Sequence, residues 1–320
     1  MGLLLFNSLQ EGLGYAILAL GVYITFRILN MPDLTVDGSF GLGMAVSIVL
    51  TVAGHPFLAL LVACLAGAAA GYFTGLLQTK VKIHPILAGI LTMNGLYTVN
   101  LIITGGKSNV SSAVAVSLFN LLQDATGLSR DLCKIIIPFI LCVIVVAVLA
   151  VFFKTRKGLA IRATGDNEDM VRSSSINADV YKCAGLAIGN ACVALSGAVI
   201  GQSMSFFDVG YGSGMVVVGL ASVIIGETIM GRHGVTVGLI SAVVGSCLYR
   251  MFIAAALKVD LFPAYSLKLI SAVIVIIALA IPTLQKKLGS RRHKGGASRC
   301  ENYRESERLS IRELPMRKRH

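Results

Sequence analysis

Charged residues are scarce in this sequence. Asp, Glu, Lys and Arg make up 14% of its 320 residues, whereas soluble globular proteins carry about 25%. Hydrophobic residues make up 55%, and the mean hydropathy is +0.79. This composition excludes a soluble enzyme, a disordered chain and a secreted domain built on disulfides. The apolar runs are long enough for helices rather than barrel strands, so the sequence predicts an all-α integral membrane protein.

The sequence also lacks the residue patterns of metal, disulfide and catalytic sites. None of the seven cysteines forms a CxxC pair, and most lie in apolar runs, where Cys behaves as a small hydrophobe. The five histidines are scattered and show no HExxH spacing. No arrangement in the apolar runs suggests paired catalytic carboxylates or a nucleophile with its base. We therefore expect no catalytic residues, no metal site and no cofactor.

The apolar runs divide into nine expected spans of about 20 residues, the length that a helix needs to cross a bilayer. The spans cover residues 9–29, 37–54, 56–78, 84–104, 133–153, 182–204, 211–231, 234–256 and 264–284. The count changes to eight or ten if residues 105–122 re-enter the membrane. The expected architecture is a polytopic helical bundle, with a transmembrane domain at 1–284 and a tail at 285–320.

Positive charge gathers at alternate ends of these spans. The tail holds 12 Lys and Arg against 4 Glu, and further basic residues lie at the span ends at Arg27, 80–82, 154–157 and Arg232. Cytoplasmic loops concentrate Lys and Arg. With nine spans, this pattern places the N-terminus outside and the C-terminus in the cytoplasm. We interpret the basicity as cytoplasmic segments, not as a nucleic-acid surface. The tail is expected to be partly disordered, and its basic start could contact anionic membrane lipid.

The longest internal polar segment, residues 154–182, joins the fifth and sixth spans. Gly165 can break a preceding helix, and Asp166 or Asn167 can cap a new one. Glu168 and Asp169 suit the first turn of that helix, Met170 and Val171 are its apolar residues, and Arg172 lies near its end. A short polar helix with an apolar knob is suited to docking in the groove of a partner. The alternative is a solvated loop without a partner.

This segment resembles the cytoplasmic coupling region of ABC-transporter permeases of the branched-chain amino acid and ribose type. The matching residues are Lys157-Gly158, Arg162-Ala163, Gly165-Asp166-Asn167 and Ile176-Asn177. Ser175 replaces the usual Gly before the Ile. The stretch 219–226 resembles a later block of the family, although Glu227 stands where a second Gly is common. The stretch 34–39 (LTVDGS) is similar to a sub-branch that includes aromatic amino-acid permeases. The resemblance covers about residues 9–284.

The resemblance implies a role and a set of partners. The chain would be the permease subunit of an ATP-driven importer in the bacterial inner membrane, forming the path for a small solute, with an amino acid favoured. A separate ATPase would dock on the helix at 165–172, an extracytoplasmic binding protein would deliver the solute, and a second permease chain, a homodimer being favoured, would complete the path. The chain itself would have no ATPase site. Its one GKS sequence, at 106–108, lacks the first Gly of a phosphate-binding loop, because that position is Leu101.

Two features suggest how the bundle is organised. Asp37-Gly38-Ser39 opens the second span and Tyr211-Gly212-Ser213 opens the seventh, and a shift of five spans reverses direction, which is typical of inverted repeats in transporters. Small residues four apart, such as those at 67, 71 and 75, predict close helix packing. That packing lies within the bundle or, alternatively, between two chains.

Polar side chains within apolar spans are expensive in a bilayer and often functional. The candidates for the translocation path are Asp37, Ser39, Asn94, Asn190 and Arg250. Asp37 could instead cap its helix, Arg250 could reach the outer surface, and the Asn side chains could join helices by hydrogen bonds.

An alternative function is an ion-coupled secondary transporter that uses Asp37 or Glu227 as its ion site. Arg232 lies five residues after Glu227, so a local ion pair between the two is also expected.

Overall fold

The computed structural model describes residues 2–113, 115–231, 234–258, 272–273 and 276. Most of these residues are helical. Seven of their helices are long and apolar enough to cross a membrane, which fits a polytopic membrane protein. They correspond to the first six expected spans and to the eighth, with bounds that differ by no more than four residues. The expected span at 264–284 and the tail lie outside the described residues.

Short connections join the helices from α1 to α4, and shorter elements separate the later long helices. The first is α1 (Gly2–Val22), which continues as the π-helix η1 (Tyr23–Ile28). The others are α2 (Thr35–Val52), α3 (Pro56–Thr79), α4 (Pro85–Ile103), α6 (Arg130–Phe152), α9 (Ala178–Met204) and α11 (Val235–Lys258). Pro56 and Pro85 each stand at the first helical position, where the missing N–H of proline removes no helical hydrogen bond.

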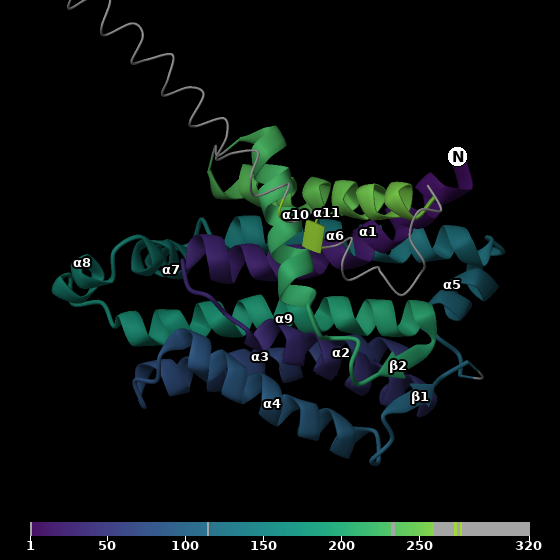
Figure 1. Ribbon diagram of the computed structural model, residues 1–320, viewed down its shortest axis with the longest axis horizontal. Coiled ribbons are helices and arrows are strands. Elements are labelled where there is room, and N and C mark those ends of the chain that lie inside the picture. The colour runs from purple at the N-terminus through teal and green to yellow at the C-terminus, as the bar shows by residue number, and fades with distance from the viewer. Residues whose placement is uncertain (1, 114, 232–233, 259–271, 274–275, 277–320) are drawn as a thin grey trace, which may run out of the picture. The chain divides into compact units, whose positions relative to one another are not determined.

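The shorter elements lie mostly at the two ends of the long helices. At one end are β1 (Asn109–Ser111), α5 (Leu118–Thr126) and β2 (Phe206–Asp208), with β1 and β2 paired antiparallel. At the other end are α7 (Arg156–Asp166) and α8 (Glu168–Ser173), as Figure 1 shows. The described residues of the segment 105–122, which could have re-entered the membrane, contain β1 and the start of α5 and no helix of spanning length.

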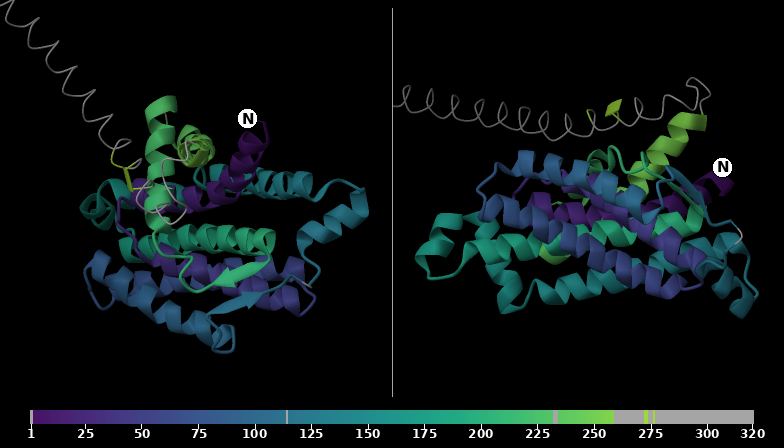
Figure 2. Two further views of the ribbon diagram at one scale, coloured as in Figure 1. Left: turned by 45° about the vertical axis from the view of Figure 1, so that its right-hand side comes forward. Right: turned by 90° about the horizontal axis from the view of Figure 1, so that it is seen from below.

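The helix α10 (Met215–Met230) differs from the span expected at 211–231. It has 16 residues, because Tyr211–Gly214 form turns instead of a first helical turn. In Figure 1 it stands across the long helices, and the turned view in Figure 2 agrees. The span expected at 211–231 is therefore shorter in the structure than expected, and α10 is not among the helices long enough to cross a membrane.

Helix α9 forms the centre of the bundle, and small residues make its close contacts possible. A Cβ on Gly67 or Gly71 of α3 would overlap with α9 backbone or side-chain atoms, and a Cβ on Gly197 of α9 would overlap with the carbonyl oxygen of Phe40 in α2. Ser47 and Ser196 donate hydrogen bonds to backbone carbonyls of neighbouring helices. These small-residue stripes are thus seams within one chain.

Two helices begin inside the bundle rather than at its end. The segment before α2 carries Asp33, which is fully buried and accepts a hydrogen bond from Asn190, near the middle of α9. The start of α10 meets the first turn of α2, where a Cβ on Gly212 would overlap with the carbonyl oxygen of Asp37. The two stretches that suggested an inverted repeat therefore lie against each other, while the repeat itself stays a prediction.

Candidate functional site

The polar segment between α6 and α9 folds into two short helices. Thr155 caps α7 by accepting a hydrogen bond from the backbone N–H of Gly158, and the Asn167 side chain caps α8 by accepting one of 3.0 Å from the N–H of Met170. A cap at Asn167 was one of the two expected. Gly165 and Asp166 belong to the end of α7 rather than to the new helix, so the expected single helix over 165–172 begins at Glu168 instead.

Gly165 does not break α7. A Cβ at this position would overlap with the carbonyl oxygen of Ile28 and lie 2.8 Å from the Cα of Leu29. The glycine therefore allows α7 to lie directly on the backbone that follows α1. On the same side of α7, Ile161 is almost fully buried in the core cluster that contains Ile28 and Leu29. The sequence suggested that Gly165 breaks the preceding helix, and it did not indicate this packing.

The two apolar residues of α8 have opposite environments. The Met170 side chain is 59% exposed, whereas Val171 is 1% exposed. Successive helical residues point about 100° apart, so both cannot face the same partner. Including Val171 in an exposed docking knob was therefore wrong, and Met170 is the apolar side chain of α8 that the structure presents outward.

Ionic contacts fasten α8 to the start of α9. Glu168 pairs with Arg172 on its own helix and with Lys182 of α9, and Arg172 also pairs with Asp179. The hydrogen bond from Lys182, reinforced by Arg172, holds the pKa of the Glu168 carboxyl below its ordinary value of 4.5 against the opposing effect of partial burial. The spacing of four residues between Glu168 and Arg172 could have revealed their pair. The contacts with α9 could not be read from spacing.

Of the five path candidates, the structure brings two together. Asp37 and Asn94 line a pocket of about 180 Å³ between the start of α2, α4 and the turns before α10, with Tyr97, Asn100 and Ser213. Both carboxylate oxygens of Asp37 are engaged, accepting 2.8 Å hydrogen bonds from the backbone N–H groups of Gly214 and Val216. Asp37 thus caps α10 rather than its own helix, and it does so within this pocket.

The other three candidates lie elsewhere. Ser39 is fully buried, and its hydroxyl finds no partner among the described residues. The Asn190 side chain donates a 2.7 Å hydrogen bond to Asp33, which also accepts one from the backbone N–H of Thr35 and so caps α2. Sequence reasoning missed Asp33, which lies two residues before α2.

The Arg250 side chain contacts two residues of α1. Its guanidinium is 3.1 Å from the Glu11 carboxylate and lies 3.6 Å from the centre of the Tyr15 ring. The Tyr15 hydroxyl is in turn 3.0 Å from that of Tyr211. These contacts connect α1, α11 and the turns before α10, so Arg250 joins helices at this position rather than lining the pocket around Asp37.

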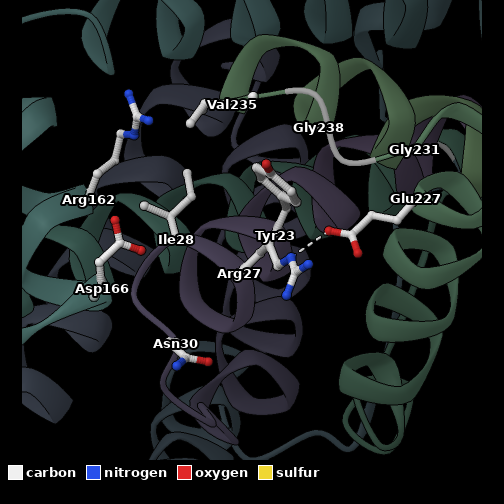
Figure 3. A pocket seen from close by; sticks show the side chains of 12 residues that line it. Tyr23, Arg27, Ile28, Asn30, Arg162, Asp166, Glu227, Gly231, Val235 and Gly238 are labelled. Atoms are coloured by element: carbon white, nitrogen blue, oxygen red, sulfur yellow. Dashed lines mark ion pairs between the residues drawn. The ribbon is translucent and has the colours of Figure 1, made fainter. Parts of the chain in front are cut away.

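A second ion pair lies near α7. The Arg27 side chain of η1 and the Glu227 side chain of α10 are 2.6 Å apart, with 35% and 10% of their surfaces exposed. They line a pocket of about 380 Å³ between η1, α7, the end of α10 and the start of α11. Figure 3 shows Arg27 and Glu227 facing each other there, with Arg162 and Asp166 of α7 on the opposite wall. The expected partner of Glu227, Arg232, lies outside the described residues.

Comparison with known proteins identifies the family of this chain. The family of branched-chain amino acid transport system permease components matches residues 4–279. The chain belongs to this family. A tyrosine transport system permease protein from Clostridioides difficile is 37% identical over 283 residues, covering 88% of this chain and 92% of that protein. The autoinducer 2 import system permease protein LsrC of Yersinia enterocolitica is 29% identical over 242 residues, covering 74% of this chain and 63% of its own length. No solved structure matches the chain.

Membership establishes the general role of the chain. It is a permease component of the ABC importer type, a multi-pass inner-membrane protein. Permease components of this kind are transport subunits without an ATPase site of their own. The family works with ATPase and solute-binding partners in general. The resemblance inferred from the 154–182 segment is thereby confirmed.

Proposed function

We propose that this chain forms the translocation path of an ATP-driven importer for an amino acid, with an aromatic side chain favoured. A separate ATPase docks on α7 and α8, and an extracytoplasmic binding protein delivers the substrate. Two copies of the chain form the complete permease. The end of the bundle with α7 and α8 is cytoplasmic, as are the tail at 285–320 and the C-terminus, and the N-terminus is outside.

The observation that carries this proposal is the pair of helices at one end of the bundle. Met170 is an exposed apolar side chain on α8, whose other exposed side chains are polar. The pairs of Glu168 and Arg172 with α9 hold that helix in one orientation. A partner that binds Met170 would therefore move α9 and α7 with α8. A secondary transporter has no need of such a surface.

The substrate class rests on two weaker supports. The pocket around Asp37 and Asn94 offers a carboxylate, amide groups and the half-exposed Tyr97 ring, which suit the polar and aromatic parts of an amino acid. The stretch 34–39 resembles the aromatic amino-acid sub-branch, and the relative from C. difficile is named for tyrosine transport. We therefore choose L-tyrosine as the first substrate to test.

The experiment is ATP-dependent uptake of L-tyrosine into vesicles that contain the chain, its ATPase and its binding protein. Met170→Asp is expected to reduce both co-purification of the ATPase and uptake by at least tenfold, because a charge replaces the apolar contact. Val171 is left unchanged, since a charge in its buried position would unfold α8.

Met204→Asp is the matched control. Met204 is 43% exposed at the opposite end of α9, so this variant should keep the ATPase bound. The proposal would be contradicted if the ATPase co-purified normally with the Met170→Asp variant. It would also be contradicted by uptake that needs an ion gradient and no ATPase.

A further inference from the structure

Both ends of α10 are held by one short stretch of the chain. At its N-terminus, Gly214 and Val216 donate backbone hydrogen bonds to Asp37. Near its C-terminus, Glu227 pairs with Arg27. The two anchoring residues are only ten positions apart in sequence, on either side of the connection between η1 and α2. The position of α10 therefore depends on the position of residues 27–37.

The same stretch is the surface on which α7 rests. Gly165 lies against the backbone of Ile28 and Leu29 so closely that a side chain would not fit between them. A contact between two backbones has no flexible side chain to absorb a displacement. A shift of α7 toward the bundle must therefore move residues 28 and 29, and Arg27 is the next residue.

The backbone around Arg27 is irregular, which suits a segment that changes position. Residues 23–28 form a π-helix, a conformation that is rare and often found at functional sites. Asn30 has a positive φ of 54°. The pocket of about 380 Å³ that adjoins Arg27, Glu227 and α7 leaves room on one side of the pair. Figure 3 shows this space between the pair and the side chains of α7.

We infer that the Arg27–Glu227 pair transmits movement of the ATPase-docking helix α7 to α10, through the Gly165–Ile28 contact. This inference rests on the proposed function, because it takes α7 and α8 as the docking site. Arg27 and Glu227 are thus positioning residues. They touch neither ATP nor substrate. They determine the position of α10 when the ATPase moves, and thereby the position of the turns that meet Asp37.

The test uses the full chain in vesicles with its ATPase and its binding protein loaded with L-tyrosine. Glu227→Gln and Arg27→Gln are each expected to keep the ATPase bound and to reduce ATP-driven uptake at least tenfold. The double variant Arg27→Glu with Glu227→Arg restores the pair with its charges exchanged. It is expected to recover at least a third of wild-type uptake, which a loss of folding would not allow. Arg27→Lys, which keeps the charge, should retain most uptake.

The matched control breaks the ion pair between α1 and α11. Glu11→Gln removes the partner of Arg250, at a site that does not adjoin α7, and should leave uptake within about twofold of the wild type. Wild-type uptake in both Gln variants would overturn the inference, and so would loss without rescue by the exchanged pair. If the wild-type chain itself shows no ATP-driven uptake, the proposed function fails and this inference with it, so the two failures are distinguishable.

Discussion

The carboxylate of Asp37 in the first turn of α2 accepts a 2.8 Å hydrogen bond from the backbone N–H of Val216 in the first turn of α10. The two residues are 179 positions apart, and the contact joins two helices that both begin inside the bundle. A helix N-terminus carries unpaired N–H groups and a partial positive charge. In this structure that end of α10 is already satisfied by Asp37.

Removing this cap should weaken the fold. Asp37→Ala is expected to lower the free energy of unfolding by about 1–2 kcal/mol, because the N–H groups of Gly214 and Val216 lose their acceptor. Asp37→Asn keeps one acceptor oxygen and should cost about half as much. Thermal unfolding in detergent measures the difference. The control Asp124→Ala removes an exposed carboxylate from α5 and should change stability by less than about 0.5 kcal/mol. Equal stability of Asp37→Ala and this control would contradict the prediction.

The buried pair of Asp33 and Asn190 should show strong energetic coupling. Asp33→Ala leaves the Asn190 Nδ2 without its 2.7 Å acceptor and is expected to cost about 1–3 kcal/mol. Asn190→Ala should cost a similar amount. Because both changes remove the same hydrogen bond, the double variant should be more stable than the sum of the single effects predicts by at least about 0.5 kcal/mol. Strictly additive effects in chemical unfolding would show that the bond contributes nothing.

Adding one methyl group to α7 should disturb its contact with the bundle. Gly165→Ala places a Cβ where the carbonyl oxygen of Ile28 lies, so we expect a loss of about 1–3 kcal/mol and weaker binding of the ATPase. The control is Gly95→Ala in α4, where a Cβ would meet no atom within 4 Å. That change should be neutral or stabilise the helix by up to about 1 kcal/mol. Co-purification and thermal unfolding of the two variants test the contrast, and identical behaviour would disprove it.

The attachment of α8 should depend on pH through Glu168. The pKa of this carboxyl is lower in the folded protein than its ordinary value of 4.5, chiefly because of Lys182. Its contribution is therefore complete above that ordinary value and disappears as the pH falls through the lower folded pKa. Hydrogen exchange of the 167–182 segment, corrected for the intrinsic rate, should accelerate as the pH falls below the ordinary value of 4.5 and through the lower folded pKa.

Glu168→Gln is the control for this pH profile. It removes the titrating group, so its corrected exchange should be faster at neutral pH and change little on acidification. The same acid-induced acceleration in this variant would assign the effect to other carboxylates.

The local features of this protein were determined by nearby residues. Long apolar runs require helices in a bilayer because every backbone group must be bonded within the segment, so most spans could be placed from sequence. The cap at Asn167 needs only an Asn before a turn of acidic residues. The polar segment between α6 and α9 could also be recognised from sequence, because its charges interrupt an otherwise apolar chain.

The tertiary structure alone decided which distant groups meet. Periodicity places a residue on its own helix but does not specify the helix that packs against it. It therefore could not show that Asp37 caps α10, that Glu227 pairs with Arg27, or that Val171 faces inward while Met170 faces out. The length and direction of α10 were likewise hidden, because the turns at Tyr211–Gly214 are set by contact with α2. These contacts arise only when segments far apart in the chain pack together.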